Sequence, residues 1–418
     1  MTDRNKIRIL HTSDFHIGLT SWDWPDARTG KSSRFIEIAR SLMEIKKIAD
    51  EKDVDMVLIT GDLFHRRNPQ PHENNLLAKF LIEIVSKKIP IAIIRGNHEL
   101  PRISGGEHAI GIYRTLEIPG VYIVDNEKPA TIITKSGKVQ VAGIPYPTKQ
   151  DARKLIGEGF KANPENWARY FDMTIEKLSR MLDTDIPSIL AAHTYISGAK
   201  SARGRMVFNK SEPIAMISSF ANPKFDYIGI GHIHRHQVIP AGPGQIAIYS
   251  GSIVRTSFAE EKQEKGIVIA DIQKGKMPEY EFIPLKNAQK MVTIEADIRG
   301  NVDIVDAIKR SIHSRNLDDA IIRFYYKTER EKPPIRRAIL KQTMPEAFKI
   351  IPMRSIVSEN HEQKRSHRIK TAEPITELGA YIDSIGKYES RKNEILELAK
   401  KIINERNREM DIFEKDSN

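Results

Sequence analysis

Short apolar runs that each end in a potential metal ligand place the strongest constraint on how this sequence can fold. The clearest run, Asp55–Thr60, is rich in aliphatic and β-branched residues and stops at Gly61 and Asp62. Runs of this length and composition are typical of buried strands. In α/β folds, ligands bind beyond the carboxyl ends of the strands. We therefore expect Asp62 to lie at a sheet edge, among side chains contributed by other strands.

Four further strand ends carry residues of the same kind. Asp14 and His16 are two residues apart, a spacing that sends both side chains the same way from an extended segment, so that both can bind one ion. A histidine taken alone is more often an ordinary core or surface residue, and the chain has 13 of them. Five strand ends of this kind are not expected by chance. We interpret them as one site containing Asp14, His16, Asp62, Asn97, His98, His193, His232 and His234.

The order of elements predicts an α/β fold for residues 1–285. Helical spacing of apolar residues recurs between the first runs, in Phe35–Lys46 and Leu76–Val85. Early β-α-β units followed by strand-rich sequence favour an α/β sandwich with mixed sheets. The predicted strands are Lys6–Leu10, Met56–Thr60, Ile89–Ile94, Ala130–Thr134, Val139–Ile144, Ser188–Ala192, Tyr227–Ile230, Ile246–Tyr249 and Ile267–Ile272.

The sequence after Pro284 predicts three further parts. Residues 286–350 begin with a polar stretch and then follow a β-α-β pattern that suits a small α+β domain. Its elements are expected at Met291–Ile298, Asp303–Arg315 and Ala320–Tyr326, with a short basic helix at Ile335–Lys349. Residues 351–374 are polar and typical of a linker. Residues 375–418 contain amphipathic helices, which either fold back on the core or dock on a partner.

Composition limits the metal, the compartment and the substrate. The absence of cysteine excludes thiolate ligands, and a mixed histidine and carboxylate set favours manganese or iron over magnesium. The sequence shows no run of eighteen apolar residues and no signal peptide, which favours a cytoplasmic protein without a membrane span. The net charge is +11, and residues 351–418 are neutral, so the basic excess lies in residues 1–350. That excess fits a polyanionic substrate, although a solvated basic surface explains it equally well.

The types of ligand indicate phosphoester hydrolysis. Two ions about 3.5–4 Å apart, bridged by one carboxylate, hold both the attacking and the leaving oxygen of a displacement at phosphorus. We expect Asp62 to be that bridge. We also expect His98 to face a bound substrate, with Glu99 orienting its ring from behind. The basic loop of residues 198–205, just after His193, is either a solvated loop or a contact to a phosphate backbone.

Five motifs resemble those of the calcineurin-like metallophosphoesterases. They are His11–Gly18, Thr60–His65, Gly96–Glu99, Gly229–His234 and Tyr249–Arg255. Within that superfamily, Gly-Asp-Leu-Phe-His and Tyr-Ser-Gly-Ser are most similar to the SbcD-type nucleases of double-strand-break repair. The resemblance implies a calcineurin-like β-sandwich flanked by helices in residues 1–285. It also implies a DNA-binding capping domain in residues 286–350 and a C-terminal helical segment, residues 375–418, that binds a partner.

The resemblance also implies a role for each residue of the site. Two Mn²⁺ ions are expected, with Mg²⁺, Fe or Zn²⁺ as alternatives. One ion would be bound by Asp14, His16, Asp62 and His234, and the other by Asp62, Asn97, His193 and His232. His98 would contact the scissile phosphate, where it would stabilise the transition state or protonate the leaving oxygen, and His65 would lie near the substrate.

An activity and partners follow from the same resemblance. The chain would be the nuclease subunit of a repair complex, with 3′→5′ exonuclease and single-strand or hairpin endonuclease activity on DNA. Residues 375–418 would bind an SbcC-type SMC-like ATPase. The homodimer interface would be formed by Pro71–Ser86 and Glu107–Leu116. The complex would be cytoplasmic and associated with the nucleoid. Two alternatives stay open: a stand-alone phosphodiesterase for small substrates, and a non-catalytic tether, which the complete ligand set disfavours. The candidate DNA contacts are Lys200, Arg203, Arg205 and Arg255.

Overall fold

The structure, a computed structural model of the 418-residue chain, describes residues 6–26, 29–101, 106–201, 212–313, 315–356, 374–385, 388–401 and 403. Its contacts divide the chain into two compact units. One comprises residues 1–294, 314–324 and 340–351, and the other comprises residues 295–313, 325–339 and 352–418. Every predicted site residue that the structure describes belongs to the first of these units.

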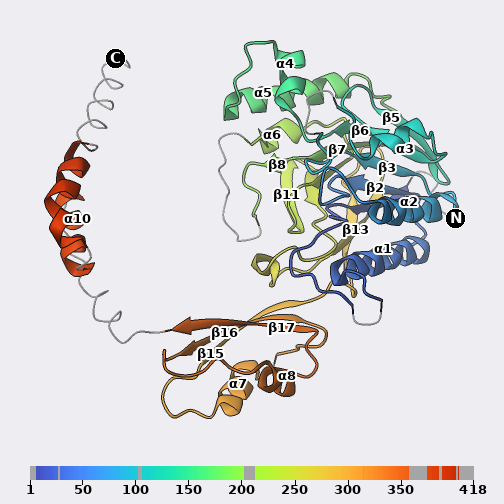
Figure 1. The fold of residues 1–418 in the computed structure, drawn as a ribbon. Helices are drawn as coiled ribbons and strands as arrows, with labels where there is room; N and C mark the ends of the chain where they lie inside the picture. The colour runs from blue at the N-terminus through green and yellow to red at the C-terminus, as the bar shows by residue number, and fades with distance from the viewer. Residues whose placement is uncertain are drawn as a thin grey trace. The chain divides into compact units, whose positions relative to one another are not determined.

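Two six-stranded sheets form the centre of this unit (Figure 1). In the first sheet β1 to β4 run parallel, and β13 and β14 are antiparallel to their neighbours. The strand order is β14 (Glu279–Pro284), β13 (Gly266–Ile272), β1 (Ile7–Thr12), β2 (Met56–Thr60), β3 (Ile91–Ile94) and β4 (Val121–Val124).

The second sheet has four parallel strands between two antiparallel edge strands. Its order is β11 (Gln237–Gly242), β12 (Gln245–Tyr249), β10 (Tyr227–Gly231), β7 (Ser188–His193), β6 (Gly137–Ile144) and β5 (Ala130–Thr134). Each of the predicted strands in residues 1–285 overlaps a strand of one of these two sheets. The strands β4, β11 and β14 were not predicted.

Helices cover the outer faces of both sheets, so the unit is a sandwich of four layers (Figure 1). The two-residue period of β2 shows how one strand serves two layers. Val57 and Ile59 pack in the cluster under the helices, whereas Met56 and Leu58 pack in the cluster between the sheets. The predicted α/β fold is confirmed. The helices are α1 (Ser33–Glu51), α2 (Pro71–Val85), α3 (Gly111–Thr115), α4 (Lys149–Ile156), α5 (Pro164–Ser179) and α6 (Ile217–Phe220).

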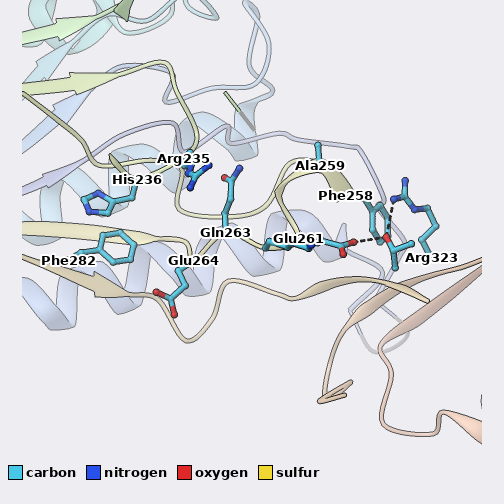
Figure 2. Close-up of a pocket in the computed structure, with 11 residues that line it drawn as sticks. Arg235, His236, Phe258, Ala259, Glu261, Gln263, Glu264, Phe282 and Arg323 are labelled. Carbon is cyan, nitrogen blue, oxygen red and sulfur yellow. Dashed lines mark hydrogen bonds between the residues drawn. The ribbon is translucent and has the colours of Figure 1, made fainter. Parts of the chain in front are cut away.

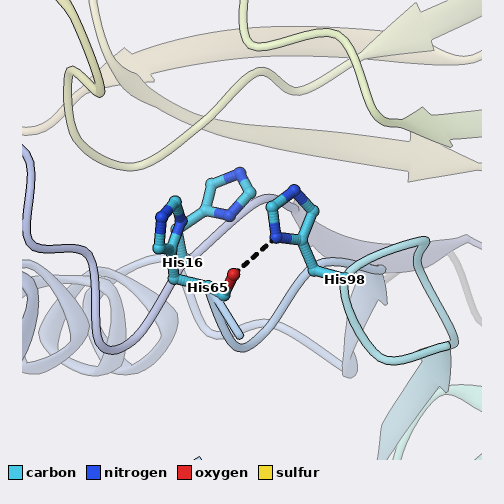
Figure 3. A group of neighbouring side chains, drawn as sticks. All are labelled: His16, His65 and His98. Carbon is cyan, nitrogen blue, oxygen red and sulfur yellow. Dashed lines mark hydrogen bonds between the residues drawn. The ribbon is translucent and has the colours of Figure 1, made fainter. Parts of the chain in front are cut away.

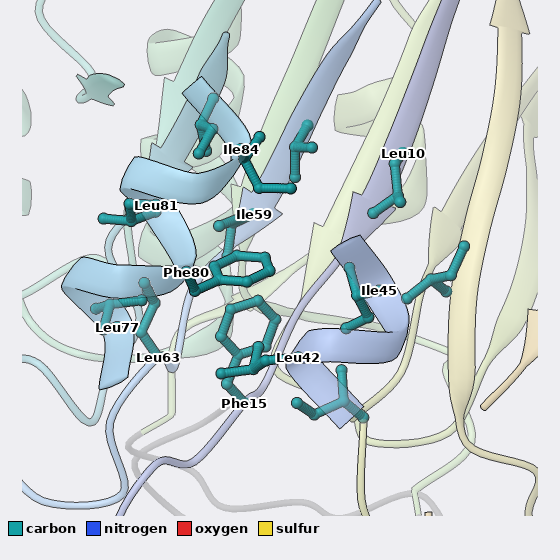
Figure 4. Close-up of a cluster of buried hydrophobic side chains, with 14 of the residues drawn as sticks. Leu10, Phe15, Leu42, Ile45, Ile59, Leu63, Leu77, Phe80, Leu81 and Ile84 are labelled. Carbon is teal, nitrogen blue, oxygen red and sulfur yellow. The ribbon is translucent and has the colours of Figure 1, made fainter. Parts of the chain in front are cut away.

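The layer of α1 and α2 fixes the strands that carry the site (Figure 4). α1 starts where the side chain of Ser32 accepts a hydrogen bond from the Phe35 amide, and α2 starts at Pro71. Burial of each leucine or isoleucine stabilises the fold by about 1.5–3 kcal/mol. The side chains packed in this cluster include Leu10, Phe15, Leu42, Ile45, Ile59, Leu77, Phe80, Leu81 and Ile84.

A three-stranded sheet follows later in the sequence, in the order β15 (Met291–Asp297), β16 (Ile321–Thr328) and β17 (Lys349–Ile356). β15, α7 (Ile304–Ile312) and β16 lie close to the positions predicted for a strand, a helix and a strand. The expected helix Ile335–Lys349 is shorter, because α8 covers only Arg337–Thr343. β17 was not predicted, and it extends into the residues assigned to the linker that was expected to begin at 351.

The remaining elements are short or lie near the C-terminus. α10 (Pro374–Ile385) begins one residue before the predicted amphipathic segment, and helical residues 392–401 fall within it, whereas residues 402 and 404–418 lie outside the described residues. Among the helices that the structure describes, none is both long and apolar enough to cross a bilayer. The short elements are β8 (Tyr195–Ile196), β9 (Ile214–Ala215), η1 (Phe258–Glu260) and η2 (Glu389–Arg391).

Candidate metal centre

The predicted ligands come together where strands from both sheets end. The loops after β1 and β2 are joined by main-chain hydrogen bonds of 3.0 Å, from the Asp14 amide to the Gly61 carbonyl and from the His16 amide to the Asp62 carbonyl. Four of the nine non-glycine residues with positive φ among the described residues are candidate ligands. Left-handed backbone of this kind is concentrated at functional sites. These four residues are Asp14, His16, Asp62 and His232.

Glycines allow the loops to approach one another this closely. A Cβ atom at Gly96 would collide with Asp62, and one at Gly231 would collide with the Thr60 carbonyl and the Ser13 hydroxyl. Glycine is therefore required before Asn97 and before His232, because no larger residue fits at these two positions.

A first ligand group consists of Asp14, His16 and His234, whose candidate ligand atoms lie within 4.8 Å of one another. The Nε2 atoms of the two histidines are 2.9 Å apart. Asp14 Oδ1 lies 4.0 Å from His16 Nε2 and 3.9 Å from His234 Nε2. Both Asp14 and His16 are buried.

A second ligand group consists of Asp62, His193 and His232, together with the side-chain oxygen of Asn97. Asn97 Oδ1 lies 3.1 Å from His193 Nε2 and 3.0 Å from His232 Nδ1. The other ring nitrogen of His193 is 2.6 Å from the Thr60 carbonyl, to which it must donate. This contact fixes which nitrogen of His193 is left to bind an ion.

Asp62 lies between the two groups, with one carboxylate oxygen toward each. Its Oδ1 is 3.5 Å from His193 Nε2 in the second group, and its Oδ2 is 3.9 Å from His16 Nε2 in the first. Burial alone would raise the pKa of Asp62, but the charge of His193 and its contact with the carboxylate outweigh it and hold the pKa well below the usual value. Asp62 is therefore ionised and able to bridge two cations.

His16 of the first group and His193 of the second differ in charge. Burial, followed by repulsion from His234, lowers the pKa of His16 well below its usual value. Burial would also lower the pKa of His193, but the Asp62 carboxylate raises it to about 9. His193 is thus protonated near neutral pH in the metal-free protein, and a bound metal ion would displace that proton.

The donor atoms fit divalent metal ions. Within the part of the chain that the structure describes, the buried Asp14 Oδ1 has no hydrogen-bond partner. Nε2 of a neutral His232 donates to Glu212 at 2.7 Å, so its Nδ1 carries no hydrogen. Nδ1 and the Asn97 oxygen are then two acceptors that face each other. Acceptors about 3 Å apart match two ligands that each lie about 2.1 Å from one shared ion. Both groups therefore have the chemistry to bind one divalent ion each.

His65 and His98 lie beside the first group, where they form a cluster with His16 (Figure 3). His98 Nδ1 donates to the main-chain carbonyl of His65 at 2.6 Å, and the His98 amide donates to Asp62 Oδ1 at 2.9 Å. The His98 side chain is 32% exposed, with Nε2 3.9 Å from Asp62 Oδ2. A ring held in this way can present Nε2 to a substrate over the site.

Glu99 takes a different role from the one expected. Its buried carboxylate accepts hydrogen bonds from the amides of Asp62, Phe64 and Gly96, at 3.1, 2.9 and 2.9 Å. Burial and the neighbouring Asp62 raise the pKa of Glu99 to about 7. Glu99 thus fixes two of the ligand loops, and the partner that orients His98 is the His65 carbonyl.

Sequence reasoning missed two carboxylates behind the histidines. Glu260 accepts from His234 Nδ1 at 2.9 Å, and Glu212 accepts from His232 Nε2. Glu260 lies in the mixed-charge run Glu260–Lys265, which is typical of a solvated loop, and no spacing marks it as buried. Tyr249 of the fifth motif accepts from the Ile196 amide and donates to the Thr194 carbonyl, so it stabilises the segment that follows His193.

The predicted DNA contacts have different outcomes. Lys200 is exposed. Arg203 and Arg205 lie outside the described residues. Arg255 is 9% exposed, and its guanidinium donates to the carbonyls of Gln263, Ala288 and Gln289. Arg255 is therefore not a surface contact for DNA, because its guanidinium is buried and both terminal nitrogens already donate within the protein.

Comparison with known proteins agrees with this fold. The sequence model of the calcineurin-like phosphoesterase family matches residues 7–236, more than half of the chain, so the chain belongs to this family of metal-dependent phosphoesterases. It is also similar to two curated proteins whose names identify them as the SbcD component of the nuclease SbcCD. The one from Bacillus subtilis is 26% identical over 298 residues, covering 69% of this chain and 72% of the relative. The one from Staphylococcus epidermidis is 26% identical over 296 residues, covering 70% and 73%.

A solved structure, that of TT1561 of Thermus thermophilus, is similar with a TM-score of 0.38. The identity is 12%, and the match covers 67% of this chain and 99% of that chain. The family assignment does not depend on this likeness.

Proposed function

We propose that this chain is the nuclease subunit of a complex for double-strand-break repair and that it hydrolyses phosphodiesters of DNA at a two-metal site. The observation that carries the proposal is the position of Asp62, whose two oxygens face two separate groups of metal-binding side chains. The names of the curated relatives support the nuclease assignment. The basic net charge of +11 supports a polyanionic substrate.

Each group would bind one ion, for which we propose Mn²⁺. When bound, the two ions would activate water and neutralise the charge that develops on the phosphate oxygens. The ligands would be Asp14, His16, Asp62 and His234 for one ion, and Asp62, Asn97, His193 and His232 for the other.

His98 is proposed to act on the substrate directly. Because its Nδ1 hydrogen is given to the His65 carbonyl, the proton that it can transfer is the one on Nε2. A protonated His98 would contact the scissile phosphate and donate that proton to the leaving oxygen. The side chain of His65 would contact the substrate on the same side of the site, since its ring centroid lies 5.4 Å from that of His98.

A cleavage assay tests the proposal against action on small substrates. Linear duplex DNA, hairpin DNA and a small aryl phosphodiester are incubated with the full chain and Mn²⁺, with Asp62→Ala as the control. We expect 3′→5′ degradation of the duplex and opening of the hairpin, both absent in the control. Rapid turnover of the small ester with intact DNA would overturn the proposal in favour of a stand-alone phosphodiesterase.

The partner assignments belong to the same proposal. Residues 286–350 would form a DNA-binding capping domain and residues 375–418 would bind an SbcC-type ATPase, in a nucleoid-associated complex. Tyr381, Tyr388 and Leu398 are exposed, which supports a docking role for that segment. Homodimerisation through α2 and α3 is supported by the exposed side chains of Ile82, Ile112 and Leu116.

Deletion of residues 375–418 separates the partner role from catalysis. We expect the truncated chain to cleave DNA at the rate of the full chain and to lose co-purification with the ATPase. A truncated chain that still co-purified would show that the ATPase binds elsewhere.

A further inference from the structure

Two carboxylates outside the sequence motifs each accept a hydrogen bond from one candidate metal-binding histidine. Glu260 contacts Nδ1 of His234 at 2.9 Å, and Glu212 contacts Nε2 of His232 at 2.7 Å. A carboxylate can only accept, so the contacted ring nitrogen must carry the hydrogen. The opposite nitrogen of each ring, which faces the ligand group, is left with its lone pair free for an ion.

Glu260 is fixed on several sides. Its Oε2 lies 2.6 Å from Lys265 Nζ, and its Oε1 accepts from the Thr256 hydroxyl at 2.7 Å. Lys265 also donates to the main-chain carbonyl of His234 at 2.9 Å. The side chains of Glu260 and Lys265 are 2% and 0% exposed. His234 is thus held at both its ring and its backbone by one buried ion pair.

A buried ion pair is weak evidence for stability, because desolvation offsets the attraction between the charges. A role in orienting a metal-binding ring accounts for it better, since such partners raise the metal affinity of the histidine that they contact. We propose that Glu260, held by Lys265 and Thr256, is the positioning residue for His234, and that Glu212 is the positioning residue for His232. This inference rests on the proposed two-metal function and assigns one outer carboxylate to each ion.

The two carboxylates are not equivalent. The side chain of Glu260 is 2% exposed, whereas that of Glu212 is 18% exposed. Water can therefore reach Glu212 and partly replace its contact to His232. Loss of Glu260 should weaken metal binding more than loss of Glu212.

The neighbouring residue provides a matched control. Glu261 accepts from the hydroxyl of Thr293, and Phe258 lies under the guanidinium of Arg323, 4.5 Å from the ring centroid (Figure 2). Neither of these contacts involves His234. Glu261→Gln thus changes the same charge in the same segment without touching a metal-binding histidine.

The test is a titration of the metal-free full chain with MnCl₂, followed by calorimetry and by the electron paramagnetic resonance of bound Mn²⁺. We expect two ions in the wild type. Glu260→Gln should weaken one of them about 10–100-fold, Glu212→Gln should weaken the other by less, and Glu261→Gln should change neither. In a His234→Ala background, Glu260→Gln should have no further effect on binding, because it acts through His234.

The outcomes distinguish this inference from the proposed function. An unchanged titration in Glu260→Gln, or an equal loss in the His234→Ala background, would overturn the inference while the two-metal function stands. Wild-type protein that binds no Mn²⁺ would overturn both. If Glu260→Gln fails to fold because Lys265 is left unpaired, Glu260→Gln/Lys265→Met removes the lone charge and is subject to the same criteria.

Discussion

The two ligand groups share Asp62 but differ in what supports them. In the first group, His234 is backed by the buried pair of Glu260 and Lys265. In the second group, His193 is backed by a main-chain carbonyl and His232 by Glu212. Ligands held by buried partners lose less freedom on binding. The ring of His234 is therefore more strongly preorganised than that of His232, whose partner Glu212 is partly exposed.

The largest effect is expected from replacing Asp62, the residue that both ligand groups share. Asp62→Asn replaces the shared carboxylate by a neutral amide, so both groups should lose their ion. We expect phosphodiester hydrolysis to fall by at least ~10³-fold, and calorimetry to detect neither ion. Asp53→Asn is the matched control, since Asp53 also has positive φ and its side chain is 86% exposed. Retention of one tightly bound ion in Asp62→Asn would show that Asp62 serves only one group.

His98→Ala tests a residue that belongs to neither group. Loss of the proposed proton donor should slow hydrolysis about 10²-fold or more. Titration with Mn²⁺ should still give two ions with wild-type affinities, because His98 contributes its amide, not its ring, to Asp62. A lost ion in this variant would make His98 a ligand and would redefine the first group.

Metal binding to the second ligand group should depend on pH, because it competes with a proton on His193. The pKa of His193 is about 9 in the metal-free protein, above its usual value, so the ring is protonated at pH 7. An ion entering the second group must displace this proton. Its apparent affinity should therefore rise about tenfold per pH unit from pH 7 and level off above pH 9. Calorimetry in two buffers of different ionisation enthalpy measures the released proton. Affinity that is flat over this range would contradict the assignment of His193 as a ligand.

The smallest effect is expected from Thr256→Val, which removes one hydrogen bond to Glu260 without changing the shape of the side chain. A hydrogen bond to a charged group contributes about 1.5–3 kcal/mol. Only part of this acts on His234, because Lys265 still holds Glu260, so one ion should bind several-fold more weakly. The affinity of the other ion should stay unchanged. Equal weakening of both ions would mean that the two groups are not supported separately.

Much of the fold and of the candidate site could be predicted because local patterns carry that information. Alternation in β2 and the three-to-four-residue spacing in α1 each reflect one buried face. Polar residues such as Asp14, Asn97 and His232 directly follow apolar runs, and parallel strands end at one edge. The edge strands β11 and β14 were missed, because their exposed faces weaken the apolar signal.

The class of fold and the ligands proposed for the centre could be predicted from the sequence alone, since every proposed ligand lies at or just after the end of a strand. The contacts that support these ligands became visible only in the tertiary structure. Glu99 fixes two ligand loops, and Glu260 with Lys265 holds His234. Arg255 is buried. The physical reason is that these contacts join residues from different strands and loops. A charged side chain in a loop has the same local sequence whether it meets solvent or a buried partner.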